Sequence, residues 1–185
     1  MQIKVCGMDP SMTNWGLAYA SLNVHTQELS ELVFILVEPT KITQKQVRQN
    51  SVDLNVAEQI CNDVLGFADI SRFIFVEVPV GSQSARSMCS YGMCVGIVGA
   101  LKSRSTPLIE VTATEVKLAL TGNKNATKAE MINAALKLYP SADFPRLKGR
   151  VLAKSEHLAD ALGAILAGIK TPMFQSILKA YQTKE

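Results

Sequence analysis

Three acidic residues in this 185-residue sequence occupy unusual positions for a charged side chain. Asp9 and Glu77 each end a short apolar run, and Asp160 lies inside the apolar segment 158–165. A carboxylate in such surroundings is costly to bury unless it is paired, protonated or bound to a cation. Hard divalent ions such as Mg²⁺ are bound by carboxylate oxygens. If these segments are neighbours in the fold, the sequence predicts a metal site formed by the three acids.

Each of these residues also has an ordinary structural interpretation. Asp9 precedes Pro10 and could simply shape a turn. Glu77 could point into solvent beyond its strand, and Asp160 could lie on a helix surface. His157 lies three residues before Asp160, so the two side chains share one face of a helix. His157 is therefore either a surface histidine or, beside a metal site, a ligand or a proton carrier.

The elements that would position these residues follow from hydrophobic periodicity. Short apolar or alternating runs predict five strands, over 2–8, 15–22, 29–37, 72–77 and 107–111. The first three, with a polar turn over 23–27, would form an antiparallel meander. Helical spacing predicts helices over 46–67, 84–102, 112–120, 127–139, 155–169 and 171–181, with Thr127 and Glu130 as a capping box. We therefore expect one α/β domain over residues 1–185, with helices on both faces of a mixed sheet.

Composition agrees with a folded intracellular protein. Hydrophobic residues make up 48% and charged residues 19%, which is typical of globular rather than disordered chains. The four cysteines, Cys6, Cys61, Cys89 and Cys94, have no C-x-x-C spacing, so we expect structural thiols in a reducing compartment. The sequence has no signal-peptide core and no apolar run of the ~20 residues that a membrane span needs. A cytoplasmic location is expected, in the host cytoplasm if the source is viral.

Four segments, spread over most of the chain, resemble the RuvC family of Holliday-junction resolvases within the RNase H-like nuclease superfamily. They are Gly7–Gly16 (GMDPSMTNWG), Phe75–Glu77 (FVE), the lysines of 115–117 and 127–128, and Glu156–Leu162 (EHLADAL). The resemblance implies an RNase H-like fold with a five-stranded sheet, in which the meander is followed by parallel strands. It also implies metal ligands at Asp9, Glu77, His157 and Asp160. Many family members have an acid at the position of His157, and others have histidine.

This resemblance implies a Mg²⁺-dependent crossover junction endodeoxyribonuclease of DNA recombination and repair. Two Mg²⁺ ions, for which Mn²⁺ could substitute, would be held by the four ligands, with Asp9 bridging them. Lys128, and secondarily Lys117, would neutralise charge that grows on the scissile phosphate. Symmetric cuts across a four-way junction need two active sites, so the resemblance implies a homodimer. The helix over 84–102 contains Gly92, Gly96 and Gly99, which suit either a dimer interface or close packing on its own sheet.

Basic residues gather in one part of the chain. The span 117–154 contains Lys117, Lys124, Lys128, Lys137, Arg146, Lys148, Arg150 and Lys154, with only Glu130 and Asp143 as acids. Such a cluster suits a phosphate-binding surface, although a solvated positive face has the same composition. Lys128 would lie in the first turn of a helix, where a cation is poorly placed unless it serves an anion. We expect DNA contacts from Lys117, Lys124, Lys128, Arg86, Arg146, Lys148 and Arg150, mainly to the DNA backbone.

Three other functions share parts of this pattern. A related RNase H-like nuclease would cut flaps, forks or RNA–DNA hybrids, and the loop over 78–86 lacks an obvious aromatic side chain to open a junction centre. Actin-like ATPases also open with a strand, an Asp and a turn, but Gly122–Asn125 is a poor match to their phosphate loops. A junction-binding protein without catalysis would not need Asp9, Glu77 and Asp160 together.

Overall fold

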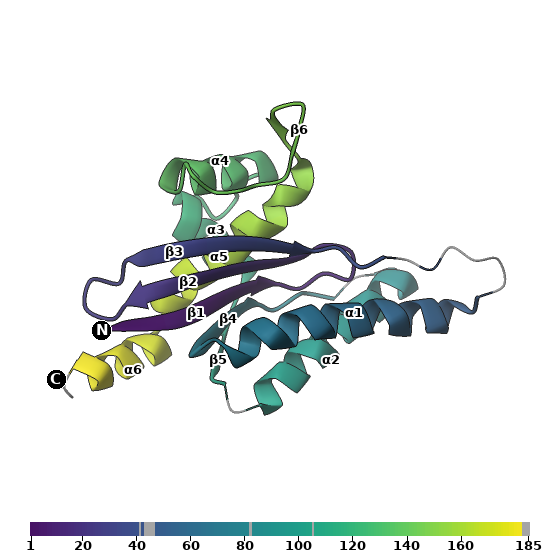
Figure 1. Ribbon diagram of the computed structural model, residues 1–185, viewed down its shortest axis with the longest axis horizontal. Helices are drawn as coiled ribbons and strands as arrows, with labels where there is room; N and C mark the ends of the chain where they lie inside the picture. The colour runs from purple at the N-terminus through teal and green to yellow at the C-terminus, as the bar shows by residue number, and fades with distance from the viewer. Residues whose placement is uncertain (41, 43–46, 82, 105, 183–185) are drawn as a thin grey trace.

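A five-stranded mixed sheet in the order β3-β2-β1-β4-β5 organises the protein in a computed structural model, which describes residues 1–40, 42, 47–81, 83–104 and 106–182 (Figure 1). Its strands are β1 (Gln2–Asp9), β2 (Trp15–Asn23), β3 (Leu29–Val37), β4 (Phe73–Glu77) and β5 (Leu108–Val111). The first three form an antiparallel meander, while β4 runs parallel to β1 and β5 runs parallel to β4. The mixed sheet expected from the sequence is confirmed.

Helices cover both faces of this sheet (Figure 1). They are α1 (Gln49–Asp69), α2 (Ala85–Ser103), α3 (Ala113–Thr121), α4 (Lys128–Leu138), α5 (Glu156–Ile169) and α6 (Pro172–Gln182), and a 3-10 turn at Ala153–Ser155 precedes α5. Buried residues of α1 and α2 share one core with one face of the sheet. On the other face, α5 contacts β1, β2 and β4 and is itself covered by α3 and α4. Ten of the fourteen residues of α5 are buried, so α5 is the central helix of the second core.

The helix bounds lie within a few residues of the predicted ones. α1 begins at Gln49, and the predicted start at 46 lies outside the described residues. Thr127 caps α4 as predicted: its side chain accepts from the Glu130 N–H, and the Glu130 side chain accepts from the Thr127 N–H. Thr112 caps α3 in the same way, which the sequence analysis did not foresee.

A small hairpin between α4 and α5 was missed. β6 (Arg146–Leu147) and β7 (Arg150–Val151) pair in antiparallel fashion in a segment where the sequence predicted no strand. Strands of two residues are too short to carry a visible alternation of polar and apolar residues, so periodicity could not find them.

The remaining sequence-based expectations concern the cysteines and membranes. All four cysteines are free thiols, and Cys6 and Cys94 are buried. Among the described residues no single helix is long and apolar enough to cross a membrane, and the one pair that reaches this length together, Ala153–Ile169 with Pro172–Gln182, is bent by 65°.

Candidate active site

The ends of β1 and β4 bring Asp9 and Glu77 to one face of the sheet. Along both strands odd-numbered residues face α5, as Val5 and Phe75 do, and even-numbered residues such as Met8 face α1 and α2. Successive side chains of a strand alternate between faces, so Asp9 and Glu77 both project toward α5. The two strands are parallel and are paired up to Met8 and Val76. Asp9 and Glu77 therefore end adjacent strands at the same level.

Close packing of α5 on the meander carries His157 and Asp160 to the same place. Gly16 pairs with Asp9 across β1 and β2, and a Cβ at Gly16 would overlap the carbonyl oxygen of His157. A Cβ at Gly7 would likewise overlap the carbonyl oxygen of Ala161. These two glycines let the helix backbone approach the strands far more closely than any larger residue would permit. The start of α5 is thereby held against Asp9.

Asp9 and His157 form a direct hydrogen bond. His157 Nδ1 lies 2.6 Å from Asp9 Oδ2, and both side chains are largely buried. Burial raises the pKa of Asp9, and the hydrogen bond and charge of His157 only partly offset it. Burial disfavours the imidazolium, but the hydrogen bond to Asp9 and the charges of Asp9, Glu156 and Asp160 outweigh it, so the pKa of His157 is raised. With Nδ1 directed at Asp9, Nε2 is the ring nitrogen left for another partner.

Glu77 and Asp160 feel each other's charge and that of Asp9. Burial, then repulsion from Asp9 and Asp160, raises the pKa of Glu77 to about 8. Burial, then repulsion from Asp9 and Glu156, raises the pKa of Asp160 to about 7. Lys117 on α3 lowers both values, which places its ammonium within electrostatic reach of the acids. When burial and neighbouring acids disfavour the ionised form of a carboxyl group, a nearby cation stabilises that ionised form.

Glu156 is a further acid at this site that the sequence analysis did not assign a role. Its Oε1 accepts a hydrogen bond from Lys128 Nζ at 2.6 Å and lies 3.8 Å from His157 Nε2. Its Oε2 is buried without a hydrogen-bond partner among the described residues. The Lys128 side chain is 80% exposed, so the Glu156 carboxylate directs an otherwise free lysine toward the acids. The spacing of Glu156 and Asp160, four residues apart on one helix, was the available signal.

The acids do not form a ready-made ligand set. Among the described residues, no three His, Cys, Asp or Glu side chains are grouped so that they could hold one metal ion. Asp9 and His157 are hydrogen-bonded to each other, and Glu156 is paired with Lys128. Binding of a cation by this cluster therefore requires side-chain rotation within it.

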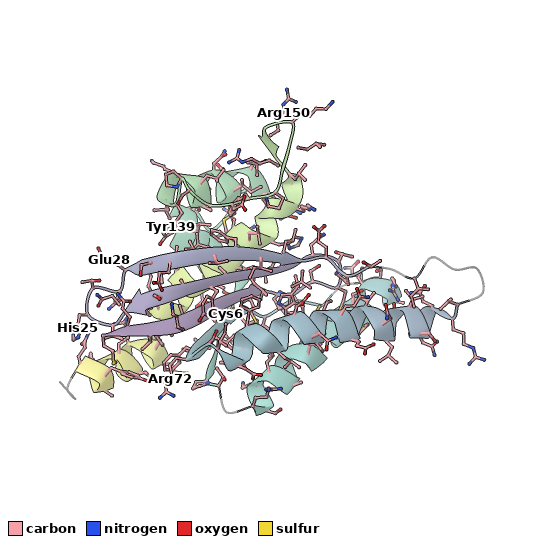
Figure 2. All side chains as sticks on the ribbon, in the orientation of Figure 1. Cys6, His25, Glu28, Arg72, Tyr139 and Arg150 are labelled. Carbon is pink, nitrogen blue, oxygen red and sulfur yellow. The ribbon has the colours of Figure 1, made fainter. Side chains whose placement is uncertain are left out.

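The other predicted DNA contacts lie outside this cluster. Arg86 is in the first turn of α2, and its guanidinium makes two 2.6 Å hydrogen bonds to Asp53 of α1. Lys124 is exposed between α3 and α4, and the basic hairpin β6–β7 projects beyond α4 (Figure 1). Figure 2 shows the Arg150 side chain at the outer end of that hairpin, pointing away from the sheet. Their role in DNA binding stays a prediction.

Comparison with known proteins identifies the fold. No protein-family model matches the sequence, and no curated protein does. Thermus thermophilus RuvC in complex with a Holliday junction substrate matches with a TM-score of 0.62 and 21% identity, over 89% of this chain and 92% of that chain. Another structure of Thermus thermophilus RuvC matches with a TM-score of 0.56 and 21% identity, over 97% and 96% of the two chains.

The chain has a RuvC-like fold. Its five-stranded sheet order and the helices on both faces match the RNase H-like fold of RuvC, which confirms the fold expected from the four sequence segments. The match spans nearly the whole of both chains.

Proposed function

We propose that this protein is a Mg²⁺-dependent DNA endonuclease whose preferred substrate is the four-way junction. One arrangement carries the proposal: at one edge of the sheet of a RuvC-like fold, Asp9 is hydrogen-bonded to His157, and Glu77 and Asp160 lie within electrostatic reach of Asp9. Clusters of carboxyl groups with strongly raised pKa values are typical of functional sites. The Thermus protein of the same fold was solved with a Holliday junction substrate, which supports branched DNA as the substrate class.

The residues at this site fit Mg²⁺ by their chemistry. Asp9, Glu77, Asp160 and His157 would hold the metal, because carboxylate oxygens are its preferred ligands. A bound cation would also offset the burial and the repulsion between acids that raise the pKa values of Glu77 and Asp160. The buried Glu156 Oε2, which has no partner among the described residues, offers a further acceptor. Bound Mg²⁺, as two ions on the family resemblance and replaceable by Mn²⁺, would supply a water of lowered pKa and charge neutralisation at the phosphate.

The remaining chemistry belongs to the side chains themselves. Asp9 fixes the ring of His157 through Nδ1, so His157 Nε2 can bind the metal or carry a proton. Lys128 Nζ, held by Glu156 beside the acids, would neutralise charge on the phosphate oxygens, and Lys117 would add to this effect. Hydrolysis would leave 5′-phosphate and 3′-hydroxyl ends, as the family resemblance implies.

Basic residues beyond the cluster supply the DNA surface. Lys124, Arg146, Lys148 and Arg150 are exposed, and the proposal assigns them to phosphate contacts. Arg86 can join them only by giving up its ion pair with Asp53. Contacts of this kind position the duplex and make affinity fall steeply with salt.

A homodimer would provide the two active sites that symmetric cutting needs. On α2, a Cβ built at Gly92, Gly96 or Gly99 would meet no atom within 4 Å. These glycines therefore do not pack on the protein's own sheet, and the alternative of the sequence analysis is wrong. Met88 and Val95, which are exposed, lie on the same side of the helix at intervals of three and four residues. The proposal places the partner protomer on this face, and a Gly96→Arg variant should be monomeric in sedimentation experiments.

The decisive experiment compares matched four-way, forked, flapped and linear DNA in Mg²⁺. Preferential, paired cutting of the four-way junction supports the proposal. Equal cutting of every branched form would overturn the junction preference and leave a general structure-selective nuclease. An Asp9→Asn variant should bind the junction and fail to cut it. Normal turnover by that variant at saturating DNA would show that the metal site lies elsewhere.

A further inference from the structure

The hairpin β6–β7 is a narrow projection at the edge of the protein (Figure 1). Arg146 pairs with Val151 and Leu147 with Arg150, which leaves Lys148 and Gly149 as a two-residue loop. Both loop residues have positive φ, 49° and 80°, as in the turns that suit the twist of a tight hairpin. Such a loop holds its neighbours in defined positions, unlike a long flexible connection.

The base of the hairpin is tied to the start of α5. Phe144, just before it, is buried and makes an edge-to-face contact with Phe34 at 4.9 Å between ring centroids. The Leu152 N–H donates to the Pro145 carbonyl at 2.8 Å, and the Ser155 hydroxyl donates to the same oxygen at 3.5 Å. Glu156 and His157 of the candidate active site follow directly. The hairpin therefore keeps a fixed position relative to the acids.

The tip combines an exposed leucine with cations. The Leu147 side chain is 63% exposed. Arg146, Lys148 and Arg150 are also exposed, and none of them forms an ion pair with another residue in the part of the chain that the structure describes. No acid occurs between 146 and 150. Lysine is also an unfavourable choice at a positive φ, where Gly, Asn or Asp is usual. Lys148 therefore places a positive charge at the tip of the hairpin although its backbone conformation is unfavourable for lysine.

We propose that the hairpin enters the branch point of bound DNA, with Leu147 against bases that are unstacked there. Lys148 and Arg150 hold the phosphates on either side. This inference rests on the proposed function, and it names the DNA feature that the hairpin recognises. Apolar side chains such as leucine insert between base steps and partly unstack them. Unstacking costs free energy at each step of a continuous duplex and less at a branch, where the stack is interrupted, so Leu147 inserts preferentially at a branch.

The reach of the hairpin fits this role. His157 follows Leu147 by ten positions, and a chain segment of that length spans at most about 35 Å when fully extended. That distance is about ten base pairs of duplex, at 3.4 Å per base pair along a strand. The hairpin must therefore contact DNA within about one helical turn of a phosphate bound at the candidate active site. A branch point close to the cleaved phosphate lies within this range.

The first test removes the apolar tip. Leu147→Ala is made in the Asp9→Asn background, so that DNA is bound but not cut. Affinity is measured for a four-way junction and for linear duplex of the same length, and 2-aminopurine at the branch reports base unstacking. We expect junction affinity to fall about tenfold, the size expected for loss of a buried leucine side chain, and the fluorescence increase to be lost. Duplex affinity should be unchanged.

A matched control and a folding check accompany this variant. Leu54 on α1 is 71% exposed, and Leu54→Ala should behave as the parent protein in both measurements. Because Leu147 is exposed, Leu147→Ala should melt at the parent temperature. If Leu147→Ala binds the junction and unstacks its bases like the parent, the proposal is wrong. Equal loss of junction and duplex affinity would also overturn it, because Leu147 would then be a general DNA contact.

The second test removes charge while keeping the turn. Asn is favoured at the positive φ of Lys148, so Lys148→Asn takes away the cation and relaxes the backbone. The salt dependence of junction affinity should then weaken by roughly one unit of slope, as for one lost phosphate contact. Lys170→Asn, at an exposed lysine after α5, should leave the slope unchanged. An unchanged slope for Lys148→Asn would remove the phosphate contact from the proposal. If the unmutated protein cuts no branched DNA at all, the proposed function fails instead.

Discussion

His157 and Asp9 are joined by a 2.6 Å hydrogen bond although 148 positions separate them in the sequence. This contact fixes one end of α5 on the end of β1, and it occupies one oxygen of the acid that the proposed mechanism needs most. Metal binding must therefore change the partners of Asp9, or use its other oxygen while His157 stays in place.

Replacement of His157 by Asp tests whether the histidine stabilises Asp9 in the absence of metal. The variant loses the proton-bearing partner of Asp9 and adds another negative charge to buried acids, so the metal-free protein should be less stable and melt at a lower temperature. Mg²⁺ should restore stability more strongly than in the parent protein, because the new carboxylate is itself a metal ligand. Thermal melts with EDTA and with Mg²⁺ measure both effects. A melting temperature that is unchanged in EDTA would mean that His157 does not stabilise Asp9.

The pH dependence of stability follows from the acids. The pKa values of Glu77 and Asp160 are raised from 4.5 to about 8 and from 3.8 to about 7. Between these limits the folded protein binds more protons than the unfolded chain, so stability falls as pH rises. His157 acts in the same direction, because its raised pKa stabilises the fold at low pH and this contribution is lost as pH rises through the folded value.

We therefore expect the melting temperature in EDTA to fall by several degrees between about pH 5 and about pH 8. Mg²⁺ should stabilise the protein more at the upper end of this range, because ionised carboxylates bind it best. Glu77→Gln removes one of the titrating groups and should flatten the profile in EDTA. A melting temperature that rises over this range would contradict the raised pKa values.

Lys128 and Glu156 provide a test of a positioning residue. Glu156→Gln removes the charged acceptor of Lys128 Nζ while keeping the size of the side chain. We expect a roughly tenfold lower kcat, the size of one charge-assisted hydrogen bond, with little change in KM. In a double-mutant cycle, Glu156→Gln should add little to the effect of Lys128→Ala, because both act through the same lysine. Fully additive losses would show that Glu156 acts independently of Lys128.

Much of this arrangement was accessible from the sequence, for identifiable reasons. Asp9 and Glu77 follow apolar runs, and the alternation of a strand fixes which face each one reaches. His157 and Asp160 share a helix face by their spacing. Glu156 was not assigned a role, because its importance comes from contact with Lys128 on another helix. The spacing of Glu156 from Asp160 indicates only a shared helix face; the contact with Lys128 depends on how α4 packs near the start of α5.

Gly16 allows α5 to pack closely on β2, and this contact can be tested by substitution. A Cβ at this position would overlap the His157 carbonyl, which is helix backbone and cannot rotate away. Gly16→Ala must therefore displace the start of α5, and we expect a loss of about 2 kcal/mol in the free energy of unfolding. His157 would move away from Asp9, so weaker Mg²⁺ binding should accompany the loss of stability. Isothermal titration calorimetry with Mg²⁺ measures this binding directly.

Gly66→Ala is the matched control for this substitution. Gly66 lies within α1, and a Cβ there would meet nothing within 4 Å. Alanine is the better helix former, so this variant should gain about 0.5–1 kcal/mol in the free energy of unfolding and bind Mg²⁺ like the parent. Denaturant unfolding and Mg²⁺ titration of both variants give the comparison. Gly16→Ala could unfold at a lower denaturant concentration than the parent and still bind Mg²⁺ normally. That outcome would mean that α5 has adjusted without moving His157, and that close packing at Gly16 contributes only to stability.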